Sequence, residues 1–144
     1  MTITGFAITG VEGKITSVEA LNRQRFPKLN INIEKVANVK GQVKVGFSFV
    51  AEYSELDKEN ASAGTIKLSG EIDIKDDKET PESIIKKWND SKMLPTNIAE
   101  EIVNGLNFRC SATGTLIAYS LGLIPPLVIS TTKIEEAPTN QKSK

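Results

Sequence analysis

The sequence predicts an α+β domain in which an antiparallel sheet comes first and two helices follow. Apolar and polar residues alternate with a period of two through the first half of the chain, and a 3.6-residue apolar stripe takes over in the second half. Strands with one apolar and one polar face are typical of an antiparallel sheet covered on one side. We therefore expect a four-stranded sheet over residues 6–75, with both helices packed on one face.

The first of the four expected strands covers residues 6–21 and contains Gly10 and Gly13, which suggest a bulge or a break. The links between strands are short and carry turn residues, with the longest over residues 55–64, and this favours antiparallel neighbours over crossovers. The other three strands alternate regularly, and their apolar residues are Leu29, Ile31 and Ile33, then Val43, Val45, Phe47, Phe49 and Tyr53, then Ile66, Leu68, Ile72 and Ile74.

Helix signals follow the strands. Thr80 is a candidate N-cap and Pro81 suits the first helical position, so a short helix is expected to run from here to about Lys92. A second, longer helix is expected after Pro95, with Gly122 as its C-cap. Its apolar stripe contains Ile98, Ile102, Val103, Leu106, Cys110, Thr113, Leu116, Ile117 and Leu121.

The two apolar patterns together predict the core. Gly105 and Gly114 weaken the long helix but would allow it to approach the sheet closely. We expect the core to contain Val45, Phe47, Ile66, Leu68, Ile72, Ile102, Val103, Leu106 and Leu116.

Length and charge set limits on the class of protein. The 144 residues fit a single domain, expected over residues 1–132, followed by a polar tail over residues 133–144 that is expected to be disordered. The 18 basic and 18 acidic residues cancel, so the chain lacks the basic surplus typical of nucleic-acid or anionic-membrane binding. A single cysteine and the lack of a visible signal peptide or spanning segment favour a cytoplasmic location without membrane insertion.

The residues for common catalytic and metal sites are missing. The chain has no histidine, which excludes histidine-activated nucleophiles and histidine-ligated zinc, and the single Cys110 cannot form a multi-cysteine metal site. The densest acidic group lacks the spacing of a calcium loop, so a solvated turn is favoured over a cation site; it contains Asp73, Asp76, Asp77 and Glu79. We expect no enzyme activity and no catalytic, cofactor or metal site.

The order of four strands and two helices resembles the SecB-like fold, which is that of the bacterial export chaperone. The resemblance is architectural over residues 15–129. Within residues 94–127 it extends to motifs that look like the helix-and-proline ending of archaeal-type SecB-like proteins, and residues 14–20 look like their first strand. These motifs are Leu94-Pro95, residues 98–104, Arg109-Cys110 and residues 121–127.

The resemblance implies a non-enzymatic holdase, or export-type chaperone, that binds unfolded or nascent polypeptides along an apolar groove. It implies no cofactor, and a homodimer or homotetramer that pairs first strands, for which Ile15 and Val18 are the candidate edge residues. Phe26 is expected to be exposed and close to the long helix. The candidate peptide-binding residues are Phe26, Leu29, Leu123 and Ile124.

Two alternatives stay open. The same sheet could serve a homo-oligomeric structural or interaction protein, for example an assembly component, without chaperone activity. An enzyme is the least favoured alternative, because a histidine-free site needs a constellation of carboxylates or lysines that the sequence does not show. The short, mixed-charge end after Pro126 also argues against contact with an export motor.

Overall fold

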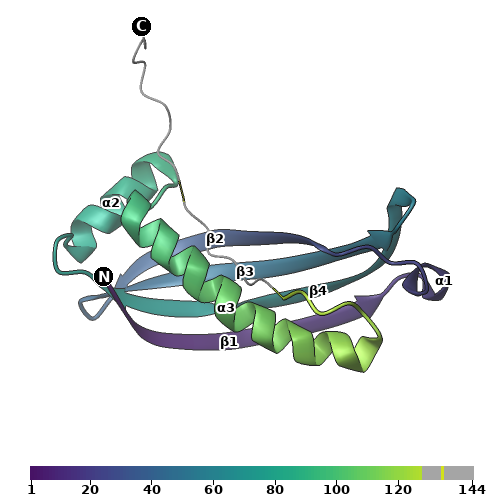
Figure 1. Ribbon diagram of the computed structural model, residues 1–144. Helices are drawn as coiled ribbons and strands as arrows, with labels where there is room; N and C mark the ends of the chain where they lie inside the picture. Colours follow the sequence, from purple (N-terminus) through teal and green to yellow (C-terminus); the bar gives the residue numbers. More distant parts are fainter. Residues whose placement is uncertain (128–133, 135–144) are drawn as a thin grey trace, which may run out of the picture.

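The computed structural model describes residues 1–127 and Ile134, and Figure 1 shows the order of its elements. One antiparallel sheet with the strand order β1-β4-β3-β2 is followed by two helices, which confirms the predicted α+β class. The end of the expected domain at residue 132 and the expected disordered tail lie outside the described residues, Ile134 apart. The elements are β1 (Thr2–Ile15), α1 (Val18–Leu21), β2 (Lys28–Val39), β3 (Gln42–Glu55), β4 (Lys58–Lys75), α2 (Pro81–Ser91) and α3 (Thr96–Leu121).

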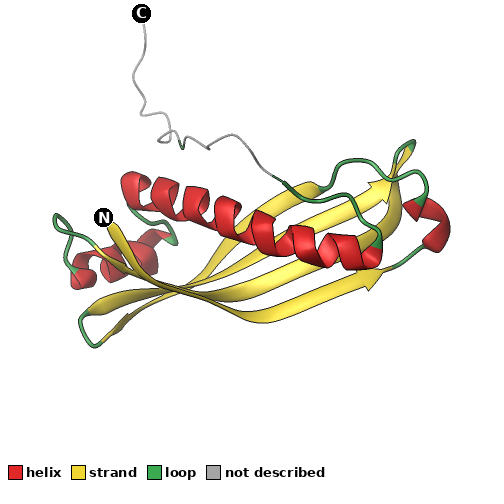
Figure 2. Ribbon diagram, turned by 60° about the horizontal axis from the view of Figure 1, so that its bottom comes forward, coloured by secondary structure: helices red, strands yellow, loops and turns green. Residues whose placement is uncertain are grey.

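The sheet has one apolar face, and both α2 and α3 pack against it. Helix α3 lies across this face and contacts β1 and β4, whereas α2 contacts β2 and β3 (Figure 2). Ile84 and Trp88 of α2 belong to the same buried cluster as the apolar residues of the central strands. The opposite face is polar, and on it the Nζ atom of Lys44 lies 2.9 Å from a carboxylate oxygen of Asp73.

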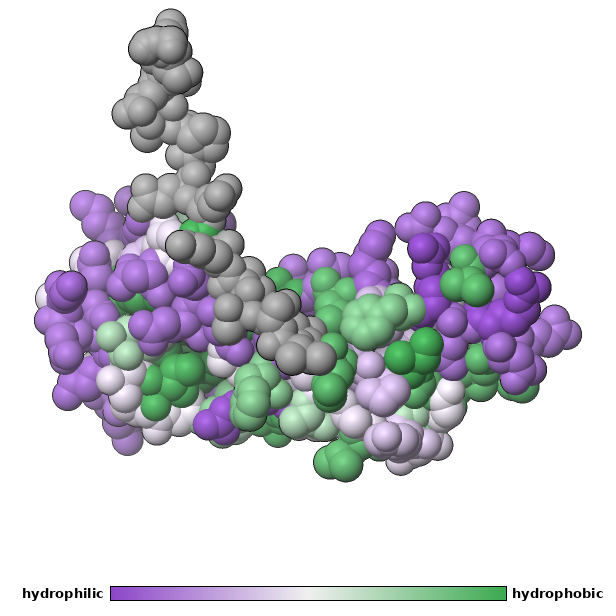
Figure 3. Space-filling model, in the orientation of Figure 1, coloured by the Kyte–Doolittle hydropathy of each residue, from purple (hydrophilic) through white to green (hydrophobic). Residues whose placement is uncertain are grey.

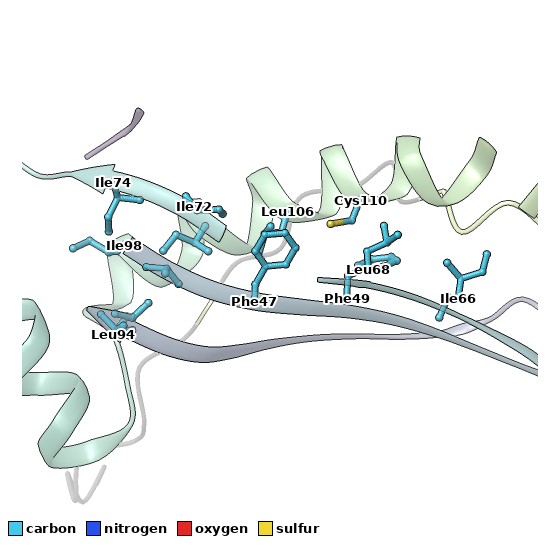
Figure 4. Packing of buried hydrophobic residues seen from close by; sticks show 14 of the residues in the cluster. Phe47, Phe49, Ile66, Leu68, Ile72, Ile74, Leu94, Ile98, Leu106 and Cys110 are labelled. Carbon is cyan, nitrogen blue, oxygen red and sulfur yellow. The ribbon is translucent and has the colours of Figure 1, made fainter. Parts of the chain in front are cut away.

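Most of the predicted core is buried between the sheet and the helices (Figure 4). Two members of the predicted set are wrong: Val103 is only half-buried, and Leu116 is 72% exposed. The confirmed residues are Val45, Phe47, Ile66, Leu68, Ile72, Ile102 and Leu106.

The error at Leu116 has a geometric cause. Apart from Ser111, the buried positions of α3 recur every four residues from Ile98 to Ala118, so the buried direction rotates by about 40° at each step around a helix of 3.6 residues per turn. A straight helix that crosses a twisted sheet meets it with such a winding stripe. Leu116 lies between two of these positions and points outward. The winding stripe contains Ile98, Ile102, Leu106, Cys110, Gly114 and Ala118.

Three expectations about the strands are corrected. The first strand starts at Thr2 and ends at Ile15, and Val18 begins the short helix α1, which Ser17 caps by accepting a hydrogen bond from the Ala20 N–H. Strand β4 starts at Lys58, so the expected long link over residues 55–64 is a tight turn. Strands β1 and β2 are not neighbours but opposite edges, because residues 16–27 with α1 cross the end of the sheet.

Local chemistry explains the turn between β2 and β3 and confirms the expected caps. The β2–β3 turn places Lys40 and Gly41 at positive φ, and the Asn38 side chain accepts a hydrogen bond from the Gly41 N–H. Thr80 caps α2 through the Ser83 N–H, and Gly122 ends α3 in the left-handed conformation.

The glycines of β1 and α3 show where close approach is needed. The register of β1 against β4 shifts next to Gly10, as expected for a bulge. A Cβ atom at Gly13 would lie 2.6 Å from a methyl group of Leu121, and one at Gly105 would lie 3.1 Å from a methyl group of Ile3. Glycine at these positions therefore allows α3 to sit directly on the edge strand.

Candidate functional site

The chain after α3 turns back against the sheet, and we call residues 122–127 the C-terminal strap. The Gln24 side chain holds it at two points, accepting from the Ile124 N–H at 2.8 Å and donating to the Gly122 carbonyl at 2.9 Å. The Tyr53 hydroxyl donates to the Ile124 carbonyl at 2.7 Å. Residues far apart in the sequence thus fix the strap beside β3, with Pro126 against the space left by Gly114.

The structure separates the four residues predicted to bind peptide. Leu29 and Ile124 are half-buried on the apolar side, whereas Leu123 is only 4% exposed and belongs to the core. Phe26 is 55% exposed and lies elsewhere. The fold therefore brings Leu123 and Ile124 together in the strap but does not gather all four residues into one cavity.

Phe26 lines a cavity of about 540 Å³ at the crossover end of the sheet. Lys28, Glu52 and Thr65, which lie on three adjacent strands in one cross-strand row, form part of its wall on the polar face. The lining residues come from the link before β2, from the strands and from the β3–β4 hairpin, and none of those described belongs to α3. Phe26 is thus exposed as expected, but its surroundings are polar strands and not the long helix.

A second cavity, also of about 540 Å³, lies where edge strand β2 meets α2 and the start of α3, and we call it the β2–α2 pocket. Its wall is largely apolar, with Lys87 and Lys92 at α2 and its end. Sequence reasoning missed this pocket, because it depends on how α2 crosses β2. Its lining residues are Ile31, Asn32, Ile33, Lys87, Trp88, Lys92, Met93, Leu94, Thr96, Ala99 and Ile134.

The outward side of α3 carries a set of exposed apolar residues that we call the outer α3 stripe: Phe108, Leu116 and Tyr119. These positions fall within an arc of about 80° on a helix of 3.6 residues per turn. Figure 3 shows hydrophobic colour along the course of α3, between two largely hydrophilic ends. Monomeric proteins rarely expose large contiguous apolar patches, so this surface is a candidate interface.

The predicted oligomer edge is divided between two elements. β1 is an edge strand, and its last residue, Ile15, is half-buried. Val18 is 74% exposed but lies in α1, not in a strand. Only Ile15 therefore sits on a backbone edge that could pair with another strand.

The pKa values of Asp76 and Cys110 are shifted by hydrogen bonds and burial that belong to the fold. Asp76 accepts hydrogen bonds from the backbone N–H groups of Glu79 and Lys78, and the Glu79 bond in particular lowers the pKa of its carboxyl. Burial raises the pKa of the Cys110 thiol to about 12. Within the described residues, no group of acidic or cysteine side chains is arranged to hold a metal ion, and no helix is long and apolar enough to cross a membrane.

The four-stranded antiparallel sheet with a long helix on one face is similar to the SecB-like fold. A solved structure with that fold, a Mycobacterium tuberculosis SecB-like chaperone (Rv1957) in complex with a ChAD peptide from the HigA1 antitoxin, aligns with this chain with a TM-score of 0.55. The alignment covers 96% of this chain and 92% of that chain at 11% sequence identity, and at that identity the similarity shows the fold alone.

No family model and no curated protein matches the sequence of this chain. The resemblance of residues 94–127 to archaeal-type SecB-like proteins therefore stays a prediction.

Proposed function

We propose that this protein is a non-enzymatic holdase that binds unfolded polypeptide at the apolar edge formed by β2. The observation that carries the proposal is a row of three aliphatic residues on this edge strand, Leu29, Ile31 and Ile33, which face the covered side of the sheet and are still only half-buried. An extended peptide beside β2 would meet both the backbone edge of the strand, which no other described strand pairs with, and an apolar surface.

Two neighbouring features support a polypeptide partner. The C-terminal strap places Ile124 at one end of this edge, and the β2–α2 pocket adjoins Ile31 and Ile33 nearer the other end. Leu29 lies at the start of β2 and Phe26 lies in the link just before it, so a peptide that extends past the start of the strand would reach both. Leu123 would join them only if the strap lifts, since it is buried here. The fold similarity to a chaperone solved with a bound peptide agrees with this class of partner.

The test is suppression of the aggregation of a chemically unfolded client, followed by light scattering while the protein is added from sub-stoichiometric amounts to excess. We expect suppression by the wild type and about tenfold weaker binding by Phe26→Ala, because burial of a phenylalanine contributes about 1.5–3 kcal/mol. Val11→Ala is the matched control, since Val11 is also exposed but lies in β1, at the opposite edge of the sheet. A wild type that suppresses nothing in excess contradicts the proposal.

The second candidate is a homo-oligomeric structural or interaction protein without chaperone activity. The outer α3 stripe favours it, because Phe108 and Tyr119 are more than 70% exposed on one side of a helix. An oligomer that buries both this stripe and the β2 edge would leave no surface for clients. Full client suppression by the intact oligomer would decide against this candidate.

A further inference from the structure

Ile134, which comes later in the sequence than the C-terminal strap, is seated in the β2–α2 pocket. Its side chain is half-buried among the pocket residues, and its backbone N–H donates to the Oε2 atom of Glu100 at 3.1 Å. Glu100 lies in the first turns of α3, and its carboxylate binds the backbone of the residue whose side chain lines the pocket. An aliphatic side chain and an adjacent main-chain N–H are thus recognised together.

This pair of contacts is of the kind that any extended polypeptide can make. The apolar wall formed by Ile31, Ile33 and Trp88 accepts a side chain, and Glu100 accepts the neighbouring backbone N–H without regard to sequence. Lys87 and Lys92 also line the pocket, so positive charge lies beside its apolar wall.

We propose that the β2–α2 pocket binds an aliphatic side chain of an extended polypeptide and that Ile134 is its resident occupant, so that the chain's own C-terminal segment competes with clients. The competition with clients rests on the function proposed above, whereas the occupation of the pocket by Ile134 does not. An intramolecular occupant has an effective concentration set by its tether, in the millimolar range for short flexible links. Weakly binding clients are therefore excluded, and only clients that bind the edge at several points displace Ile134.

The pocket contains its own reporter, because Trp88 is the only tryptophan of the chain. In the full-length protein, Ile134→Glu should shift the Trp88 emission to longer wavelength and increase its quenching by acrylamide. Leu127→Glu is the matched control, since it places the same charge at an exposed aliphatic residue that does not line the pocket. Equal emission and quenching for the two folded variants and the wild type would overturn the occupation of the pocket by Ile134.

A synthetic peptide with the sequence of residues 129–140 tests the site in trans. Added to the Ile134→Glu variant, it should restore the wild-type emission, and the wild type should need about tenfold more peptide for any response, because its own segment competes. A copy of the peptide with glutamate in place of Ile134 should leave the emission of the variant unchanged. A restored emission with both peptides would contradict recognition of the aliphatic side chain.

The aggregation assay separates this proposal from the function on which its second half rests. If clients compete with Ile134, the Ile134→Glu variant should suppress aggregation at lower concentration than the wild type. Equal potency of variant and wild type would overturn the competition. Failure of both to suppress, together with the expected response of Trp88, would refute the holdase function and leave Ile134 as the established occupant of the pocket.

Discussion

The Tyr53 hydroxyl fastens the C-terminal strap to the sheet, because it donates to the Ile124 carbonyl from an otherwise buried side chain. Tyr53→Phe keeps the packing and removes this bond, so the free energy of unfolding should fall by about 0.5–1.5 kcal/mol. Urea denaturation measures it. Tyr119→Phe is the control, since Tyr119 is exposed on α3 and its loss of a hydroxyl should change the stability little. Equal stability of the two variants would show that the bond does not hold the strap.

Burial of Tyr53 and Cys110 also makes the stability depend on pH. Burial raises the pKa of the Tyr53 hydroxyl above its ordinary value of 10.0. Burial also raises the pKa of the Cys110 thiol from 9.0 to about 12. A group whose pKa is raised by folding stabilises fully below its unfolded pKa, and this contribution is lost as the pH rises through its folded value. We expect a constant free energy of unfolding up to about pH 8.5 and a decline from about pH 9 upward.

Urea denaturation between pH 7 and pH 10.5 measures this decline. Tyr53→Phe should make it shallower, because the variant has one fewer buried acid that ionises on unfolding. A curve of unchanged steepness would contradict a role for Tyr53. The thiol of Cys110 should react with a thiol reagent in the native protein only as fast as the protein opens.

At the scale of elements, the sequence pattern predicts the strands and helices well and their meeting points poorly. The alternation in β3 and β4 identifies the buried face correctly because a strand has a fixed two-residue period. The error at Leu116 arises because the buried side of α3 depends on the angle at which it crosses the sheet, and sequence periodicity does not contain that angle. The β2–α2 pocket could not be predicted for the same reason. The alternation of Ile31 and Ile33 and the apolar face of α2 with Trp88 can each be read from the sequence, but the angle at which α2 crosses β2 cannot.

The pairing of β1 with β4 gives a sharp test at this scale. A Cβ atom at Gly70 would lie 2.0 Å from the carbonyl oxygen of Ala7 in β1, so backbone would have to move to admit it. Gly70→Ala should therefore destabilise the protein by about 1–3 kcal/mol in urea denaturation. Gly10→Ala is the matched control in the same strand pair, because its nearest atom is the hydroxyl of Ser69 at 3.0 Å, which can rotate away. A similar loss in both variants would show that the β1–β4 spacing is not set at Gly70.

At the scale of the whole molecule, the short links between strands led to a wrong prediction of which strands are neighbours. Sequence reasoning favoured neighbours for consecutive strands, yet residues 16–27 carry the chain from one edge of the sheet to the other. Nothing in the pattern of a single strand says which partner it takes, because an edge strand and a central strand can alternate alike. Among the residues that the structure describes, the crossover leaves β1 and β2 at the two edges of the sheet, and such edges need protection from unwanted pairing.

We expect the protein to form a homodimer or homotetramer, because it presents two sheet edges and the outer α3 stripe to solvent. Multi-angle light scattering at micromolar concentrations and above should give a mass of two or four chains. If the stripe lies in the interface, Phe108→Glu combined with Leu116→Glu should lower that mass, since each buried glutamate would lack a partner. Leu56→Glu changes an exposed apolar residue in the turn between β3 and β4, on neither edge strand nor α3, and it should leave the mass unchanged.

The mass to which the oligomer falls distinguishes the two interfaces. A mass that falls with the α3 variants from four chains to two identifies α3 as the contact between dimers and leaves the β1 edge, with Ile15, as the contact within each dimer. Val11→Glu in β1 should then weaken the remaining dimer, because Val11 is exposed on that edge strand in the single chain. A monomeric mass for the wild type across the whole concentration range would refute self-association, and the exposed stripe of α3 would then need a different partner.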